Sequence, residues 1–191
     1  MTFTALLLAG GESRRMGRDK ATIELGGRPL WQRQLELLRA LRPEKIFVSA
    51  RTRPSWLPAP VELLLDDFPS RGPLSGLTRG LTAMQTTHLI ALAVDMPFMT
   101  AAELGNLLER ATESCGVVPT IGERAESLAA IYPAEAARDF QTALAGSDFS
   151  LQSLVRKLAA ANKIRFLPVS ANDVECYRSL NTTGDLKEFI A

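Results

Sequence analysis

The sequence predicts an α/β sandwich built on a mostly parallel sheet, because short apolar runs alternate with segments of helical periodicity. The runs are apolar at nearly every position, which is typical of strands buried on both faces. Hydrophobic residues make up 46% and charged residues 23% of the 191 residues, an ordinary globular mixture. The length fits one domain with a sizeable core.

Seven apolar runs are the expected strands. They cover 3–9, 45–50, 61–66, 88–94, 115–119, 127–132 and 163–169. The runs after residue 115 are less regular than the first four, so the sequence predicts a mixed sheet in that half. The proline-rich stretch "RTRPSWLPAP" (51–60) is interpreted as a surface loop and not as a domain boundary.

The expected helices begin after "GRP" (27–29), after "RGP" (71–73), and near residues 101, 151 and 184. The first two present leucines along one face at helical spacing. Thr100 is a candidate N-cap, and Glu103 would complete a capping box with it. Ser150 and Thr183 are candidate caps for the last two helices.

The composition excludes several classes of function. A net charge of +1 gives no bulk basicity for nucleic acid or an anionic membrane. Cys115 and Cys176 lie too far apart for a metal-type spacing, and they predict reduced thiols in a cytoplasmic protein. The apolar start at Phe3 is too short for a membrane span. The single histidine, His88, sits at a strand entry and argues against histidine-based catalysis; a monomer is the default expectation.

The stretch "LLLAGGESRRMGRDKA" (6–21) places dense positive charge directly after the first apolar run. Ligands of open α/β sheets bind at the carboxyl ends of strands. Gly10 and Gly11 would let backbone N–H groups approach an anion, and Arg15 and Lys20 would neutralise phosphate oxygens. Neither the Walker A spacing nor the dinucleotide fingerprint is present. The alternative is a surface turn with solvated arginines.

Three other loops follow expected strands or precede the last helix. Asp95 ends an uncharged run and suits a hard cation such as Mg²⁺, although a turn aspartate is the alternative. Asp66 and Asp67 would contact a base, a ribose or a metal, or form a polar turn. "GPLSG" (72–76) would wall a flat ligand or simply start a helix. Asn181 would reach a ligand or cap the final helix.

At "LAGGESRRMGRDK" the sequence resembles the signature loop of the nucleotidyltransferases related to molybdenum cofactor guanylyltransferase, the MobA-like family. That signature reads roughly L-A-G-G-x-S-x-R-M-G-x-D-K, and nearly all its fixed positions are filled. The motifs "DDFPSRGPLSGL", "AVDMPF" and "LNTTGDL" follow in the family's order, with Thr183 where the family usually has proline. The resemblance covers the whole chain and is strongest in its first hundred residues.

The resemblance implies a Rossmann-like three-layer α/β/α sandwich of the nucleotide-diphospho-sugar transferase type, forming one domain over 1–191. A nucleotide-binding half would cover about 1–100 and an acceptor-binding half about 101–191. It also implies Mg²⁺-dependent transfer of GMP from GTP to the phosphate of molybdopterin, with release of pyrophosphate. Catalysis would use Lys20, Arg15 and Asp95, with Asp95 binding the metal and Asn181 near the acceptor.

The expected nucleotide-binding set combines the signature loop with the three later motifs. It comprises Leu8, Ala9, Gly10, Gly11, Lys20, Ser49, Asp67, Gly72, Pro73, Leu74 and Asp95. The roles of Arg14, Arg18, Asp66 and Glu126 stay open, and Trp31 and Trp56 have no expected role beyond packing and loop cover.

Two positions depart from the family pattern. Ser49 stands where guanylyltransferases often carry asparagine, and this difference concerns the choice of guanine as the base. Glu126 and Ser127 replace a His-Pro or Gln-Pro pair, and this difference concerns the choice of molybdopterin as the acceptor. A cytidylyltransferase for the molybdenum cofactor or another phosphorylated molecule is therefore the alternative within the class. A non-catalytic nucleotide-binding or cofactor-carrying module, partnering a molybdenum insertase or a molybdoenzyme chaperone, is the alternative from another class.

Overall fold

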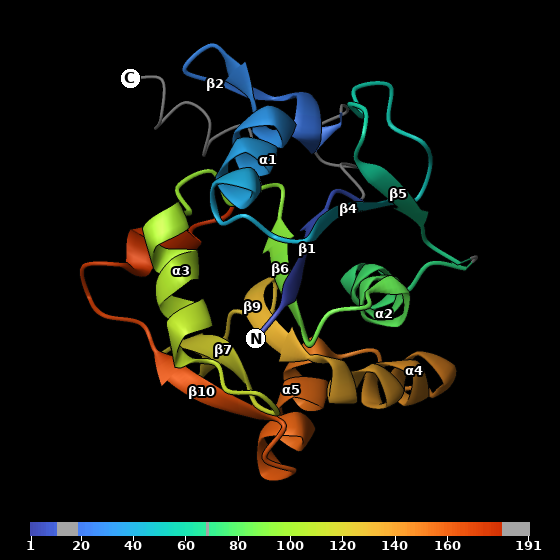
Figure 1. Cartoon of the computed structure of the whole chain (residues 1–191), viewed down its shortest axis with the longest axis vertical. Coiled ribbons are helices and arrows are strands. Elements are labelled where there is room, and N and C mark those ends of the chain that lie inside the picture. The colour runs from blue at the N-terminus through green and yellow to red at the C-terminus, as the bar shows by residue number, and fades with distance from the viewer. Residues whose placement is uncertain (11–18, 68, 181–191) are drawn as a thin grey trace.

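The computed structural model describes residues 1–10, 19–67 and 69–180 (Figure 1). Its main sheet runs in the order β10-β7-β9-β6-β1-β4-β5, and β8 pairs with β7. The strands are β1 (Phe3–Leu8), β4 (Lys45–Ala50), β5 (Glu62–Leu65), β6 (His88–Ala93), β7 (Gly116–Ile121), β8 (Arg124–Ala125), β9 (Ala129–Pro133) and β10 (Ile164–Pro168). All seven predicted runs are strands, with ends that differ by at most two residues.

The sheet is parallel in its first half and mixed in its second, as predicted. β1 lies between β4 and β6 and is parallel to both, with Leu7 level with Val48 and Leu92. β5 continues the parallel order beside β4. β9 runs antiparallel to β6 and β7, whereas β10 is parallel to β7. The carboxyl ends of β1, β4, β5 and β6 therefore meet at one edge, where the predicted loops emerge.

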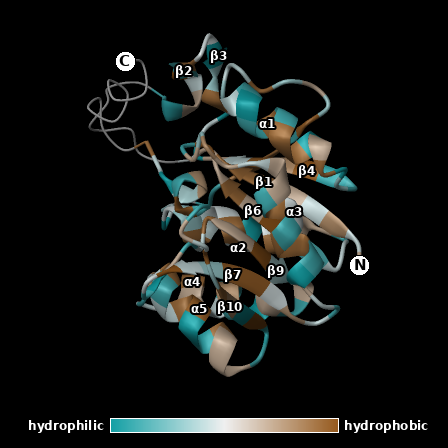
Figure 2. Ribbon diagram, turned by 90° about the vertical axis from the view of Figure 1, so that its left-hand side faces the viewer, coloured by the Kyte–Doolittle hydropathy of each residue, from teal (hydrophilic) through white to brown (hydrophobic). Residues whose placement is uncertain are grey.

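Helices cover both faces of the sheet, which confirms the α/β sandwich. They are α1 (Leu30–Ala40), α2 (Pro73–Ala83), α3 (Ala101–Arg110), α4 (Ala137–Ala145) and α5 (Leu151–Ala160). One core cluster joins α1 and α3 to alternate residues of β1, such as Ala5 and Leu7. A second cluster joins α2, α4 and α5 to the intervening residues Leu6 and Leu8. Figure 2 shows the hydrophobic residues gathered on the strands between these helices.

Some elements escaped the sequence analysis. α4 was not predicted; it carries one buried residue, Phe140. The two-stranded hairpin of β2 (Glu24–Leu25) and β3 (Arg28–Pro29) is also too short for a strand pattern. Short 3₁₀ helices occur at η1 (Lys20–Thr22), η2 (Ala134–Ala136) and η3 (Val174–Tyr177). The helix expected after Thr183 lies outside the described residues.

Side-chain caps define two helix starts. Thr100 Oγ1 accepts from Glu103 N at 3.1 Å, which confirms Thr100 as the N-cap, but the Glu103 side chain does not complete the capping box. Glu103 Oε1 accepts a hydrogen bond from the Tyr177 hydroxyl at 2.5 Å, which ties α3 to η3. Ser150 Oγ accepts from Ser153 N at 3.3 Å at the start of α5.

His88 is the first residue of β6, which confirms the predicted strand entry, and its side chain is fully buried. Burial lowers the pKa of its imidazole, and the weaker opposing effects, which include the charge of Glu135, do not reverse the shift. Cys115 and Cys176 are not joined in a disulfide. Within the described residues, no helix has the length and apolarity needed to cross a bilayer.

Candidate active site

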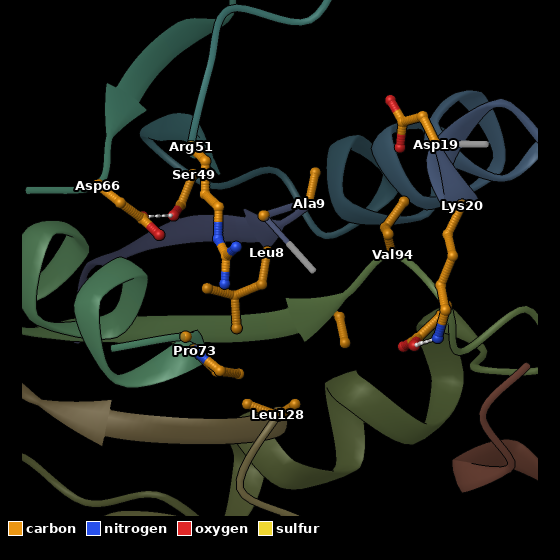
Figure 3. Close-up of a pocket in the computed structure, with 14 residues that line it drawn as sticks. Leu8, Ala9, Asp19, Lys20, Ser49, Arg51, Asp66, Pro73, Val94 and Leu128 are labelled. Atoms are coloured by element: carbon orange, nitrogen blue, oxygen red, sulfur yellow. Dashed lines mark hydrogen bonds and ion pairs between the residues drawn. The ribbon is translucent and has the colours of Figure 1, made fainter. Parts of the chain in front are cut away.

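A cavity of about 180 Å³ opens at the carboxyl edge of the parallel strands, where the sequence analysis placed the site (Figure 3). Four adjacent strands and the start of α2 supply most of its wall. It is lined by Leu8, Ala9, Gly10, Asp19, Lys20, Ser49, Arg51, Asp66, Gly72, Pro73, Ala93, Val94, Asp95 and Leu128. Eight of the predicted nucleotide-binding residues thus surround one space, although they come from five separate segments.

Lys20 and Asp95 meet at one end of the cavity. Lys20 begins η1, and Asp95 follows β6 by two residues. Lys20 Nζ lies 2.8 Å from Asp95 Oδ2, and their side chains are only 17% and 20% exposed. Screening by water is reduced at such a position, so the two charges interact strongly with each other and with an entering ion. The predicted phosphate-binding cation, Lys20, and the predicted metal-binding anion, Asp95, are therefore neighbours in space, although they lie 75 positions apart in the sequence.

A second carboxylate, Asp66, lies across the cavity from Lys20 (Figure 3). Asp66 continues the pairing of β5, because its N–H donates to the Ala50 carbonyl at 3.1 Å. Its Oδ1 accepts from Ser49 Oγ at 3.0 Å and its Oδ2 from Ser70 Oγ at 2.7 Å. Two hydroxyl groups thus fix the carboxylate in place and leave further lone pairs for a ligand.

The start of α2 forms the wall between the two carboxylates. Gly72 has φ +65°, a conformation that glycine adopts without strain, and Pro73 occupies the first turn. Gly76 packs against Ser49 and Leu8, which both line the cavity. A Cβ at Gly76 would overlap Ser49 Oγ and lie 2.7 Å from Leu8 Cδ2. Gly76 therefore serves close packing against β1 and β4, whereas Gly72 has open space at its Cβ position and supplies the positive φ.

Two residues of the predicted set lie elsewhere. Asp67 lines a different surface depression and has its Oδ1 3.8 Å from Arg79 Nη1, so Asp66 is the carboxylate that faces the cavity. Successive residues of an extended chain point in opposite directions, which separates the pair. Leu74 is 2% exposed and packs in the core with Leu77, because helical spacing puts both on the buried face of α2.

Several predicted residues fall outside the described part of the chain. These are Gly11, Arg14, Arg15, Arg18 and Asn181. Their assigned or open roles stay as the sequence analysis left them. The described chain resumes at Asp19 and ends at Leu180, whose N–H donates to the Asp95 carbonyl oxygen at 2.8 Å.

Some of the residues that line the cavity were not predicted from the sequence. Arg51 and Val94 come directly after β4 and β6, so the strand-end rule applied residue by residue would have included them. Asp19 lies next to Lys20 and was overlooked beside it. Leu128 precedes the antiparallel β9, and its carbonyl accepts from Ala93 N at 2.8 Å. No local sequence signal brings that loop to the site.

The cavity suits a metal that arrives with its substrate. Among the described residues, no three carboxylate, histidine or cysteine side chains gather closely enough to hold an ion by themselves. Mg²⁺ in phosphoryl-transfer sites takes one or two carboxylates and completes its shell with phosphates and water. Asp95, at 20% exposure beside Lys20, offers one such oxygen donor. The residues present fit Mg²⁺ bound together with a polyphosphate.

Glu126 and Ser127, the two residues that differ from the family pattern, directly precede Leu128, which forms part of the cavity wall. Burial raises the pKa of the Glu126 carboxyl group, and Arg124, with Nε 3.5 Å from Glu126 Oε1, opposes the shift. Ser127 is buried, and its carbonyl oxygen accepts from the Tyr132 hydroxyl at 2.8 Å. These contacts hold the loop on β9.

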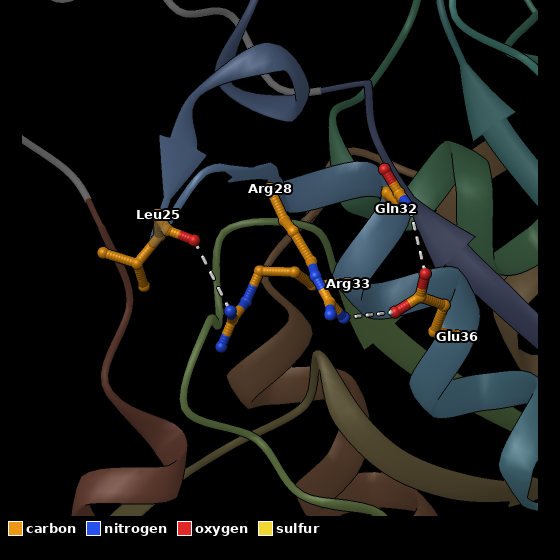
Figure 4. Close-up of polar contacts among 5 residues, drawn as sticks. All are labelled: Leu25, Arg28, Gln32, Arg33 and Glu36. Atoms are coloured by element: carbon orange, nitrogen blue, oxygen red, sulfur yellow. Dashed lines mark hydrogen bonds and ion pairs between the residues drawn. The ribbon is translucent and has the colours of Figure 1, made fainter.

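A second cavity of about 270 Å³ lies between α1 and the loop after Asp95. The two arginines that line it, Arg28 and Arg33, bind to other groups of the protein (Figure 4). Arg28 Nη1 lies 3.2 Å from Glu36 Oε2, and Arg33 Nη1 donates to the Leu25 carbonyl at 3.5 Å. Gln34 Nε2 donates to Met96 O at 2.6 Å and so braces the Asp95 loop. No residue of the predicted set lines this cavity, so the first cavity is the candidate active site.

Comparison with known proteins gives relatives along the whole chain. A "Probable molybdenum cofactor guanylyltransferase" from Opitutus terrae is 38% identical over 162 residues, covering 83% of this chain and 80% of the relative. One from Natronomonas pharaonis is 30% identical over 191 residues, covering 96% and 95%.

The fold has close structural counterparts. The crystal structure of molybdopterin-guanine dinucleotide biosynthesis protein A from Archaeoglobus fulgidus superposes with a TM-score of 0.77 at 21% identity, covering 97% of this chain and 95% of that one. At that identity the likeness shows the fold. The family model of the MobA-like NTP transferase domain matches residues 5–162, which is most of the chain. The chain therefore belongs to the MobA-like NTP transferase family.

Proposed function

We propose that this protein is a molybdenum cofactor guanylyltransferase, which transfers GMP from GTP to the terminal phosphate of molybdopterin and releases pyrophosphate. The observation that carries the proposal is the meeting of Lys20 and Asp95 at 2.8 Å inside the cavity at the carboxyl edge of the sheet. The names of the relatives supply the base and the acceptor.

The reaction is an in-line displacement at the α-phosphorus of GTP. An oxygen of the acceptor phosphate forms the new P–O bond, and the bond from the α-phosphorus to the bridging oxygen breaks, so that pyrophosphate leaves with that electron pair. The attacking group is already an anion and needs no general base. Catalysis therefore consists of holding two anions in line and stabilising the charge of the leaving group.

Lys20 is the described residue best placed for that task. Its ammonium group is held in the cavity by Asp95 and can turn from the carboxylate to a phosphate oxygen when a nucleotide enters. Arg51, a second cation on the cavity wall, adds positive charge at the end of β4. Arg15 and the N–H groups of the glycine loop keep their predicted roles as phosphate ligands.

Asp95 is the proposed magnesium ligand. When bound, Mg²⁺ would neutralise charge on the polyphosphate. Asp95 would then exchange its contact with Lys20 for the metal, while Lys20 takes the phosphate. The ion pair thus keeps both side chains oriented into the cavity before the substrate arrives. Each side chain would then exchange the other for a group of the incoming complex that binds it more strongly.

The opposite end of the cavity is proposed to hold the nucleoside. Asp66, fixed by Ser49 and Ser70, presents carboxylate oxygens to N–H donors of a base or to ribose hydroxyl groups. Guanine carries such donors on its ring edge. Ser49 occupies the place of the family's asparagine; it lines the cavity and donates a hydrogen bond to Asp66.

The test is release of pyrophosphate by the purified protein with molybdopterin, Mg²⁺ and each of the four nucleoside triphosphates. We expect release with GTP and none without Mg²⁺ or molybdopterin. Release with CTP alone would replace guanylyl by cytidylyl transfer. Binding of GTP without release under any condition would reject an enzymatic role and leave a nucleotide-binding module. Replacement of Asp95 by asparagine should abolish release while the protein stays folded, as checked by circular dichroism.

A further inference from the structure

Both tryptophans of the chain lie beside the candidate active site and stack on each other. Trp31 sits in the first turn of α1, and Trp56 sits in the proline-rich loop between β4 and β5. Their ring centroids are 5.3 Å apart, with 13° between the ring planes. Both are half-buried and pack on the core cluster that includes α1. The indole of Trp56 is therefore a rigid group in a loop that otherwise has little regular structure.

Trp56 also makes a polar contact with the segment that carries Lys20. Its Nε1–H donates to Asp19 Oδ2 at 2.9 Å. The other carboxylate oxygen, Asp19 Oδ1, accepts from Ala21 N at 3.0 Å and caps η1. The Asp19 carbonyl oxygen accepts from the N–H and the hydroxyl of Thr22, at 3.1 and 2.9 Å. Asp19 thus joins three donors of its own turn to one donor from a loop 37 residues away.

Lys20 is the next residue after this anchored aspartate. A lysine side chain has four flexible methylene groups, so the place of its ammonium group depends on where its backbone is held. Asp19 fixes that backbone through its bonds to Ala21 and Thr22, and the Trp56 N–H fixes the Asp19 carboxylate. We propose that Trp56, acting through Asp19, is a positioning residue for Lys20. The role of Lys20 as a phosphate ligand rests on the proposed function; the linkage itself rests on the contacts.

The alternative is that the stacked pair only stabilises the loop. The two roles differ in what the loss of the indole N–H would do. Asp19 is exposed, so water can replace the lost donor and the free energy of unfolding changes little. A water molecule does not tie the Asp19 carboxylate to the loop that carries Trp56. A positioning role therefore predicts a loss in turnover larger than the loss in stability would suggest.

The kinetic test compares Trp56→Phe with the matched control Trp31→Phe. Each change keeps an aromatic ring in the stack, but only Trp56→Phe removes the hydrogen bond to Asp19. We expect Trp56→Phe to lower kcat about tenfold with KM for GTP within about twofold, as for an interaction that matters in the transition state. Trp31→Phe should change kcat by less than about twofold. Equal kcat values for the two variants, or an effect confined to the melting temperature, would overturn the proposal.

A spectroscopic test needs no turnover. In the Trp31→Phe protein Trp56 is the sole tryptophan, and its emission reports the Asp19 contact. We expect the emission to shift when Asp19→Asn is added and to change on titration with inorganic triphosphate and Mg²⁺. Addition of Lys20→Gln instead should abolish the response to triphosphate. An emission spectrum that does not change when Asp19→Asn is added would refute the linkage.

The two tests also separate this inference from the proposed function. If wild-type protein releases no pyrophosphate from GTP and molybdopterin, the proposed function fails. The linkage still holds in that case when the emission responds to Asp19→Asn and to triphosphate.

Discussion

Replacement of Gly76 by alanine tests whether Ser49 and Asp66 form the nucleoside end of the cavity. Gly76 lies in α2 over the cavity floor, and its added Cβ would overlap Ser49 Oγ and lie 2.7 Å from Leu8 Cδ2. Carbon atoms pack at about 3.5 Å or more, so Leu8 must yield by about 0.8 Å. Ser49 must rotate its hydroxyl away, which breaks its 3.0 Å hydrogen bond to Asp66.

Gly80 supplies a matched control one helical turn away. A Cβ at Gly80 would lie 2.7 Å from Leu6 Cδ2 and 3.1 Å from Leu89 Cδ2, a similar crowding of leucine methyl groups that is remote from the cavity. In both variants alanine gains about 1 kcal/mol of helix propensity, and overpacking costs about 1–3 kcal/mol. Each should therefore lose up to about 2 kcal/mol of unfolding free energy, measured by urea denaturation.

The two variants should differ in nucleotide affinity. Gly76→Ala also removes one of the two hydroxyl donors of Asp66, and a hydrogen bond to a charged group contributes about 1.5–3 kcal/mol before screening by water is counted. We expect its Kd for GTP with Mg²⁺, measured by calorimetry, to rise about tenfold, or about 1.4 kcal/mol. Gly80→Ala should bind like wild type. Equal affinities for the two variants would refute the assignment of Ser49 and Asp66 to the nucleoside.

Lys20→Ala should lower kcat about 10²–10³-fold, the usual cost of losing one electrostatic stabiliser, in a pyrophosphate-release assay. Lys45→Ala, which removes an exposed lysine 2.5 Å from Glu62, is its control and should leave kcat unchanged. Tyr132→Phe should cost about 1 kcal/mol of unfolding free energy in urea, because it removes the buried hydroxyl that donates to the Ser127 carbonyl at 2.8 Å; no change would mean that water replaces the bond. Burial lowers the pKa of His88, so unfolding takes up a proton below about pH 6.5, the ordinary value for histidine, and stability should fall as the pH drops through that value. His88→Gln should flatten this part of the stability curve, and an unchanged slope would contradict the assignment.

Much of the fold was predictable because its signals are local. Strands buried on both faces must be apolar at nearly every position, so β1, β4 and β6 were recognisable without their neighbours. The edge strand β5 was recognisable from its leucines, although only Leu64 is buried. Thr100 was identified as a cap because capping depends on residues three positions apart. α4 was missed although its pattern is local too, because the residues that it packs on the core besides Phe140 are mostly small alanines such as Ala137 and Ala143.

The candidate site was predictable as a set of loops. Gly10, Lys20 and Asp95 could be named because parallel strands end at one edge and because phosphate and metal chemistry needs those residue types. Which of Asp66 and Asp67 faces the cavity could not be read from two adjacent aspartates. That choice depends on the direction in which each side chain leaves the end of β5.

The sequence by itself determined the fold class, the family and the chemical character of the loops, because each depends on residue type and spacing along the chain. Only the tertiary structure decided which distant groups meet. It brought Lys20 to Asp95, set Asp66 between two serines, and linked Trp56 to Asp19. Such pairs depend on strand order and on the direction of each side chain, and neither is encoded in local periodicity.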